Sequence, residues 1–278
     1  MQILKLIIKK IKIIFLIIIE KFLIEIKEYR FSAKERLKKQ SKLYNSLGMS
    51  RSKGLKKLNT ILRKISCETY NEDQNMSSEH LIIFAALSIK NKGVKSILEI
   101  GTYDGYTTSI LSKLFPLSQI YTIDLNDDDE IFIESYNRNN KFDRKKFIQK
   151  RNKLLGSCNN VKFIQTNSLA ISKIKKLSKK FELIWIDGAH GYPVVCADIT
   201  NAISLSGKDT IIICDDVLKI IKNSDHMYNS QASFETLESF ANAGIIKNNY
   251  FYKRIGKKHL KQVKYISYSQ MKNLKFKL

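Results

Sequence analysis

Acidic side chains follow two apolar segments of this 278-residue sequence, where they could bind a cation or take part in proton transfer. The first segment ends in Trp-Ile-Asp at Asp187 and continues as Gly-Ala-His-Gly-Tyr, which places His190 three residues further on. The second segment, 209–214, is followed by Asp215 and Asp216. Because open α/β sheets bind ligands beyond the carboxyl ends of their parallel strands, we expect these four side chains to face one site.

Three carboxylates cannot all remain ionised in one cleft unless a cation or protons compensate their charge. A hard divalent cation with oxygen ligands is the simplest compensation, and Mg²⁺ fits best. Two plainer interpretations stay open. Asp215 or Asp216 could cap a following helix, and His190 could form a hydrogen bond within its own loop.

A turn between a predicted strand and a predicted helix gives a second candidate site. The stretch 96–106 reads Ser-Ile-Leu-Glu-Ile-Gly-Thr-Tyr-Asp-Gly-Tyr, so Glu99 precedes the glycines Gly101 and Gly105. Glycine lets a backbone approach a bound molecule where a Cβ would collide, and the free N–H groups of the helix would point to the same place. Such a turn is shared by proteins that bind dinucleotides, flavins and nucleosides.

The segment 119–124 predicts a second strand, which ends in Asp124 about 20 positions after the glycines, where it would meet the ribose hydroxyls of an adenosine cofactor. At this point the sequence resembles the class I S-adenosylmethionine-dependent methyltransferases, whose acid-x-Gly-x-x-x-Gly motif stands here as Glu99, Gly101 and Gly105. Tyr103 stands in place of the usual middle glycine, as in the catechol-type O-methyltransferases. The loop lacks the Gly-x-Gly-x-x-Gly pattern that is more usual in nicotinamide dehydrogenases.

The resemblance implies S-adenosylmethionine as the cofactor. Glu99 would stabilise its methionine end through the turn, and Asp124 would bind the ribose. The loop after a third strand, expected at 161–166, would face the adenine. Asn167 stands there where the family usually has an acid, and an amide can both donate and accept. The cofactor-binding residues assigned by this likeness are Glu99, Gly101, Thr102, Asp104, Gly105, Asp124, Asn167 and Ser168.

The pattern Asp-Gly-x-His-x-Tyr, followed by an apolar strand and Asp-Asp, is similar to that of metal-dependent sugar O-methyltransferases of antibiotic pathways. By this likeness Asp187, Asp215 and Asp216 would hold Mg²⁺. Asp187 and His190 would be the catalytic residues, with His190 as the general base or a substrate contact. A bound Mg²⁺ would orient a hydroxyl and lower its pKa while a base removes the proton.

The resemblance also implies how these residues are positioned. It predicts a Rossmann-like class I methyltransferase fold, an α/β domain with a mostly parallel seven-stranded sheet whose last strand is antiparallel. Residues 71–278 would form this domain, and 1–70 a basic, amphipathic helical extension with breaks at Gly48 and near Gly54. From the sequence pattern, helices are expected at 77–91, 193–205 and 231–243, a buried strand at 181–187, and a closing hairpin at 249–255 and 262–268.

The net charge of +23 lies at the two ends of the chain. Residues 1–66 carry 18 Lys or Arg against 4 Asp or Glu, residues 245–278 carry 10 against none, and the remainder is close to neutral. This distribution favours attachment to an anionic surface or partner over a basic active-site groove.

The first 30 residues have the pattern of a helix that lies on a membrane. Lys5, Lys9 and Lys12 form one polar stripe on an otherwise apolar segment. The longest uncharged run, 13–19, is shorter than the roughly 20 residues that a spanning helix needs. The alternative is a helix that packs on the domain or on a second subunit, as in a homo-oligomer.

Two further features narrow the function. The four cysteines are far apart and form no Cys-x-x-Cys pair, which argues against a zinc site or a disulfide framework and fits a reducing, cytoplasmic setting. The only prolines are Pro116 and Pro193. The Asn/Asp-Pro-Pro-aromatic motif expected of enzymes that methylate the amino groups of nucleic-acid bases is therefore absent, which disfavours nucleic acid as a partner.

The sequence thus predicts a methyltransferase that acts on a hydroxyl of a sugar, a glycan or another small molecule, assisted by Mg²⁺. It would be cytoplasmic, with a peripheral contact to the inner face of the membrane. Two alternatives are an RNA- or ribosome-associated methyltransferase recruited by the basic ends, and a membrane-associated interaction protein that keeps the fold without methyl transfer. A hydroxylase-like branch with the same Asp-Gly-x-His-x-Tyr pattern is a further alternative among enzymes.

Overall fold

The computed structural model describes residues 31–66, 68–72, 74, 77–174, 177, 180–221, 229–256 and 262–272, together with 12, 15, 19 and 23. The predicted amphipathic helix in 1–30 lies almost entirely outside the described residues, so its contact with a membrane or a second subunit stays a prediction. Within the described ranges, no helix has the length and the apolar character needed to cross a membrane.

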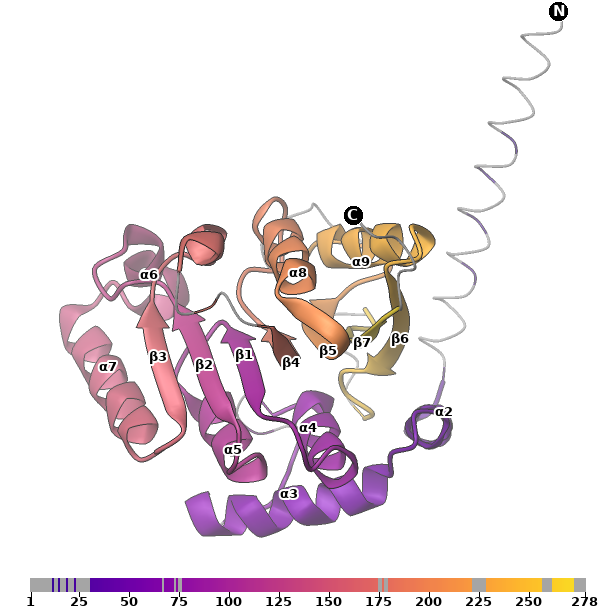
Figure 1. The fold of residues 1–278 in the computed structure, drawn as a ribbon, viewed down its shortest axis with the longest axis horizontal. Coiled ribbons are helices and arrows are strands. Elements are labelled where there is room, and N and C mark those ends of the chain that lie inside the picture. The colour runs from indigo at the N-terminus through magenta and orange to yellow at the C-terminus, as the bar shows by residue number, and fades with distance from the viewer. Residues whose placement is uncertain are drawn as a thin grey trace, which may run out of the picture.

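A seven-stranded sheet in the order β3-β2-β1-β4-β5-β7-β6 forms the centre of the molecule (Figure 1). Neighbouring strands are parallel from β3 to β5, and β7 pairs antiparallel with both β5 and β6. The predicted mostly parallel sheet with an antiparallel last strand is confirmed. The strands are β1 (Ser96–Ile100), β2 (Gln119–Asp124), β3 (Val161–Gln165), β4 (Phe181–Ile186), β5 (Ser206–Val217), β6 (Ile246–Tyr252) and β7 (Tyr265–Met271).

Helices cover both faces of the sheet (Figure 1): α3, α4 and α5 lie on one face, and α8 and α9 lie on the other. The helices expected at 77–91, 193–205 and 231–243 are confirmed as α4, α8 and α9. The described helices are α2 (Ala33–Ser46), α3 (Arg51–Ser66), α4 (Glu79–Lys90), α5 (Tyr106–Leu114), α6 (Glu130–Glu134), α7 (Lys141–Gly156), α8 (Val194–Ser204) and α9 (Ala232–Asn242), with the 3₁₀ helices η1 (Ser135–Asn137) and η2 (Ser168–Lys173).

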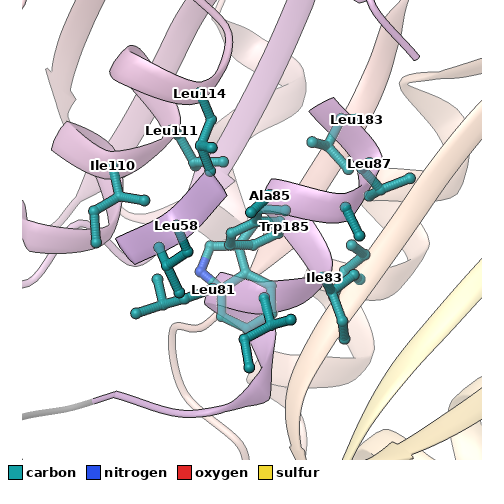
Figure 2. Close-up of a cluster of buried hydrophobic side chains, with 14 of the residues drawn as sticks. Leu58, Leu81, Ile83, Ala85, Leu87, Ile110, Leu111, Leu114, Leu183 and Trp185 are labelled. Carbon is teal, nitrogen blue, oxygen red and sulfur yellow. The ribbon is translucent and has the colours of Figure 1, made fainter. Parts of the chain in front are cut away.

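Each central strand contributes to two hydrophobic cores, because successive side chains of a strand point to opposite faces. In β4, Leu183 and Trp185 belong to the core with α3, α4 and α5, whereas Ile184 and Ile186 belong to the core with α8 and α9. Figure 2 shows the first core, in which Trp185 lies among aliphatic side chains of α3, α4 and α5. Burial of apolar surface stabilises the folded state by about 25 cal/mol per Å². The two cores therefore stabilise the central strands, whose ends carry the site described below.

Helix α3 approaches α4 closely at Gly54. A Cβ at this position would lie 2.9 Å from the carbonyl oxygen of Ile82 and 3.0 Å from the Cβ of Ala86, a space that a side chain cannot share. The predicted break near Gly54 is therefore wrong, since Gly54 lies inside α3 and permits the contact between the two helices. Leu58 and Leu62 of α3 are buried in the same core as Trp185.

Helix α2 is attached to the edge of the sheet. The side-chain amide of Gln40 donates to the carbonyl of Tyr252 (3.0 Å) and accepts from its N–H (2.9 Å), as a neighbouring strand would. Nearby, the buried carboxylate of Glu79 accepts from the Tyr44 hydroxyl (2.9 Å) and from two nitrogens of Arg51 (2.7 and 2.8 Å). Helices α2 and α3 are thus fixed to the start of α4, beside the site described next.

Candidate functional site

The loop after β1 crosses directly over the end of β4. Gly101 has φ 99°, and a Cβ there would lie 2.3 Å from the carbonyl oxygen of Asp187. Gly105 has φ 78°, and a Cβ there would meet the side chain of Leu155 at 3.0 Å. The sequence pattern predicts room for a bound molecule at these glycines, whereas the structure shows a close protein contact at each. The contact at Gly101 joins the candidate cofactor loop to the loop that carries His190.

Glu99 is fully buried near the end of β1. Its Oε2 accepts hydrogen bonds from the hydroxyls of Thr108 and Thr122, the latter at 2.6 Å, and Thr122 is paired with Thr102 at 2.6 Å. Its Oε1 is buried without a hydrogen-bond partner among the described residues. Burial raises the pKa of Glu99 to about 7. Because an unpaired buried acceptor is costly in free energy, Oε1 is suited to a donor that a ligand supplies.

Asp124 ends β2 and organises the same loop. Its Oδ2 accepts from the backbone N–H of Tyr103 (2.7 Å), which has φ 49°, and its Oδ1 accepts from the N–H of Leu125 (2.8 Å). Burial raises the pKa of Asp124, although these N–H groups oppose the shift. Each carboxylate oxygen can accept more than one hydrogen bond, so Asp124 can also accept from the hydroxyls of a ligand.

Two other residues assigned to the cofactor have local structural roles. Asp104 Oδ1 accepts from the N–H of Tyr106 (3.0 Å) at the start of α5. Asn167 is exposed, and its Oδ1 accepts from the N–H of Leu169 (3.0 Å), so it caps η2, which begins at Ser168. The predicted contacts of Asp104, Asn167 and Ser168 with the cofactor stay predictions.

The residues at the ends of β1 and β2 fit S-adenosylmethionine as a ligand. The buried, unpaired Oε1 of Glu99 is an acceptor for which the described residues provide no donor, and the methionine end of the cofactor carries an ammonium group. Asp124 lies on the neighbouring strand, at the place expected for the ribose hydroxyls. The N-terminus of α5 follows the loop, and its N-cap residue, Gly105, has no side chain to accept from the first N–H groups of the helix.

Strand β5 presents two consecutive carboxylates to one point. Side chains of a regular strand alternate between faces, but the pairing of β5 with β7 shifts register between Cys214 and Val217, and Asp216 has φ 49°. Aspartate occurs in this left-handed region more often than most residues. The irregularity allows Asp215 Oδ2 and Asp216 Oδ1 to contact the same ammonium, Nζ of Lys253, at 2.6 Å in the case of Asp215.

Two further side chains complete this cluster. Lys264 Nζ lies 2.7 Å from Asp216 Oδ2. His190 Nε2 lies 3.7 Å from Asp187 Oδ1 and 3.9 Å from Asp216 Oδ2. The four residues that the sequence placed at one site, on the ends of β4 and β5, are thus close together. The side-chain hydrogen bonds described for Asp215 and Asp216 come from lysine ammonium groups, and the helix-cap interpretation is not supported.

The charges of the cluster balance one another. Burial alone would raise the pKa of Asp215 and of Asp216, but the Lys253 ammonium holds both below their ordinary values. Burial would lower the pKa of Lys253, but the two carboxylates raise it instead. Burial and the neighbouring Asp215 raise the pKa of Asp187. Burial lowers the pKa of His190, although Asp216 opposes the shift.

These residues do not fit the predicted Mg²⁺ site at Asp187, Asp215 and Asp216. Lys253 bridges two of the carboxylates as a bound cation would, and Lys264 adds a second positive charge. A Mg²⁺ ion about 2.1 Å from the same oxygens would lie against these ammonium groups. In the described part of the chain, no group of three His, Cys, Asp or Glu side chains is arranged to hold a metal ion. The prediction is corrected: lysines supply the compensating charge.

Sequence reasoning missed Lys253, Lys264 and His80. The lysines stand in a region that is basic throughout, so nothing in the pattern distinguished them. His80 lies in the first turn of α4 and stacks on Trp185 with 5.0 Å between ring centroids. Its Nδ1 lies 2.6 Å from the hydroxyl of Ser78, and its Nε2 is buried without a hydrogen-bond partner among the described residues. Burial lowers the pKa of His80 to about 4, so the ring is neutral.

Comparisons with known proteins agree with this geometry. Residues 98–217 match a family model described as a methyltransferase domain. The O-methyltransferase TomG from Streptomyces achromogenes, involved in tomaymycin synthesis and solved in complex with SAM, has a TM-score of 0.52 and 15% identity over 84% of this chain and 96% of its own. The O-methyltransferase from Bacillus cereus in complex with SAH has a TM-score of 0.50 and 16% identity over 79% and 90%. A comparison with curated protein sequences finds no match.

The matched segment begins in β1 and ends with β5, so it contains Glu99, Asp124, Asp187, Asp215 and Asp216. The two solved structures are too distant in sequence to show more than a common fold. Together with the sheet order β3-β2-β1-β4-β5-β7-β6, they establish that this chain has the Rossmann-like class I methyltransferase fold.

Proposed function

We propose that this chain is an S-adenosylmethionine-dependent methyltransferase that methylates a hydroxyl of a small molecule, with a sugar or a glycan as the favoured class of acceptor. The observation that carries the proposal is the buried Oε1 of Glu99, which has no donor among the described residues and lies one strand from Asp124. The two O-methyltransferases of similar fold support oxygen as the acceptor atom.

S-adenosylmethionine supplies a methyl group on a positively charged sulfur. Glu99 would accept from its methionine ammonium, and Asp124 from its ribose hydroxyls. The contact between Gly101 and the peptide of Asp187 would hold the cofactor loop next to the acceptor side. The main contribution of the protein is to align the donor and the acceptor for an in-line displacement.

His190 would act as the general base. Its Nε2 would accept the hydroxyl proton while the acceptor oxygen forms a bond to the methyl carbon and the carbon–sulfur bond breaks, with the electron pair remaining on sulfur. The ring is buried, and its lowered pKa leaves it neutral at pH 7, as a base must be. Asp216, at 3.9 Å, would stabilise the imidazolium that forms, and Asp187 lies beside the ring at 3.7 Å.

Calorimetric binding of S-adenosylmethionine tests the proposal. We expect micromolar binding to the native chain and a loss of more than about tenfold in affinity for Asp124→Ala, because two hydrogen bonds to ribose and the support of the loop disappear. Asp128→Ala is the matched control, since Asp128 is exposed on the loop that follows β2. Absence of binding to the native chain would contradict the proposal.

A methyl-transfer assay then identifies the acceptor class. Labelled S-adenosylmethionine is incubated with sugars, glycans and phenols, and with RNA as a competing acceptor. Transfer to sugar or glycan hydroxyls supports the proposal. Preferential labelling of RNA would favour the alternative of an RNA methyltransferase recruited by its basic ends.

A further inference from the structure

We propose that Lys253, supported by Lys264, takes the place of a divalent cation in the acceptor site, and that the remaining N–H of Lys253 binds the acceptor oxygen. The replacement of the cation rests on the geometry of the cluster alone. The contact with the acceptor rests in addition on the proposed methyl transfer.

The position of Lys253 is fixed by the backbone on both sides. Its carbonyl accepts from the N–H of Glu79 at the start of α4 (3.0 Å), and its N–H donates to the carbonyl of Lys264 before β7 (2.9 Å). Its side chain is 13% exposed, and the Asp215 and Asp216 side chains that it contacts are 5% and 14% exposed. The ammonium is therefore held at the end of the sheet by a network, and is not a mobile surface charge.

The two lysines reproduce the charge of the ion that they replace. Lys253 and Lys264 together carry two positive charges, the same as Mg²⁺, and both contact Asp216. A lysine ammonium has three N–H groups. Two from Lys253 are used by Asp215 and Asp216, and the third has no partner in the described part of the chain.

This third N–H has a role in the proposed reaction. Lys253 would donate it to the acceptor oxygen, which orients a lone pair toward the methyl group, while the hydroxyl proton passes to His190. The carbon–oxygen bond forms as the carbon–sulfur bond breaks. A metal ion can chelate two neighbouring oxygens, whereas one N–H binds one oxygen. The site is therefore expected to accept molecules with an isolated hydroxyl and not to require a vicinal diol.

Titration of the full chain with Mn²⁺, followed by calorimetry and by thermal unfolding, tests the replacement of the cation. We expect Lys253→Met to bind Mn²⁺ more than about tenfold more tightly than the native chain, because the variant keeps the carboxylates and removes the competing charge. Mn²⁺ should raise the Tm of this variant and leave that of the native chain unchanged. Lys247→Met, which changes an exposed lysine on β6, is the matched control.

A Lys253→Met variant that binds Mn²⁺ no more tightly than the native chain would overturn the proposal. Binding of Mn²⁺ by the native chain that is lost in Asp215→Asn would also overturn the proposal. This measurement does not depend on the folding of Lys253→Met. Lys264→Met removes only one contact of Asp216 and should give a smaller gain in the same direction. Since none of these titrations needs the cofactor, failure here is separate from a failure to bind S-adenosylmethionine.

Discussion

Two groups of carboxylates lie at the carboxyl ends of the parallel strands, and they are stabilised in different ways. We call Glu99 and Asp124, at the ends of β1 and β2, the cofactor edge. Asp187, Asp215 and Asp216 with Lys253 and Lys264 form the acceptor cluster. The cofactor edge is held by hydroxyl and backbone N–H donors, which carry no net charge. The acceptor cluster is held by ammonium groups.

The difference matches the charge of what each side would bind. Neutral donors orient a carboxylate without cancelling its charge, so the cofactor edge would suit a cationic ligand such as the methionine ammonium. In the acceptor cluster two ammonium groups already compensate Asp215 and Asp216, so a neutral hydroxyl can enter without leaving a buried charge unpaired. The two sides meet where Gly101 lies against the peptide of Asp187.

The largest effect on stability is expected when the Lys253 ammonium is removed from the acceptor cluster. Lys253→Met leaves Asp215 buried without its ammonium partner and Asp216 with Lys264 alone. We expect the free energy of unfolding to fall by about 3–5 kcal/mol, as when one partner of a buried ion pair is removed. Urea unfolding at neutral pH measures it, and Lys247→Met should change the value by less than about 0.5 kcal/mol. A loss below about 1 kcal/mol would mean that the cluster is solvated and carries no structural charge.

The contact between the two sides is tested by Gly101→Ala. A methyl group there would lie 2.3 Å from a backbone oxygen, and φ is 99°. Overpacking and left-handed strain together should cost about 3 kcal/mol of unfolding free energy, and should move the loop of Asp187. Gly105→Ala meets a flexible leucine side chain instead, so about 1–2 kcal/mol is expected. Equal losses in the two variants, measured by urea unfolding, would show that the contact with Asp187 does not constrain the loops.

Glu99 at the cofactor edge should give the stability of the chain a pH dependence that a variant at this position lacks. The pKa of Glu99 is raised from 4.5 to about 7 in the folded chain, so the folded state binds a proton that the unfolded state has released. Stability contributed by Glu99 therefore falls as pH rises from 4.5 to 7, by on the order of 3 kcal/mol. Glu99→Gln cannot titrate, and the native chain should lose stability relative to it across this window. Parallel pH profiles for the two chains would contradict the raised pKa.

His80 explains why the comparison must be made between two chains and not on the native chain alone. Its pKa is lowered to about 4, so its contribution has the opposite sign and stability rises as pH rises from about 4 to 6.5. Asp198, with a pKa raised to about 6 by burial, acts in the same direction as Glu99. Both residues are present in the native chain and in Glu99→Gln, so their contributions cancel in the difference.

The sequence predicts the cofactor edge better than the acceptor cluster, and the reason is the distance along the chain over which each is built. The strand expected at 119–124 is β2 residue for residue, since its apolar run and terminal acid are local features. The partners of Glu99 lie 9 and 23 residues away, within the next two elements. Local patterns of this kind are visible in a single sequence.

The acceptor cluster depends on long-range pairing. Lys253 lies 38 residues beyond Asp215, after β6, and reaches it only because β7 pairs with both β5 and β6. Strand β5 also extends past the predicted 209–214, so Asp215 and Asp216 lie inside an irregular strand. The three carboxylates led to the prediction of a divalent metal ion, because the sequence could not show that lysines from distant strands contact Asp215 and Asp216.

The smallest expected effect concerns a single neutral donor at the cofactor edge. Thr108→Val keeps the shape of the side chain and removes one of the two hydroxyls that donate to Glu99 Oε2. We expect a loss of about 1–2 kcal/mol of unfolding free energy, because a buried acceptor loses one donor. Since that donor lowers the pKa of Glu99, its removal should raise this pKa further and reduce the affinity for S-adenosylmethionine at neutral pH. Thr107→Val, the adjacent residue of α5, is the control. If both variants bound the cofactor as tightly as the native chain, Glu99 would not be oriented by its hydroxyl donors, and the difference between the two sides would lie in Asp124 alone.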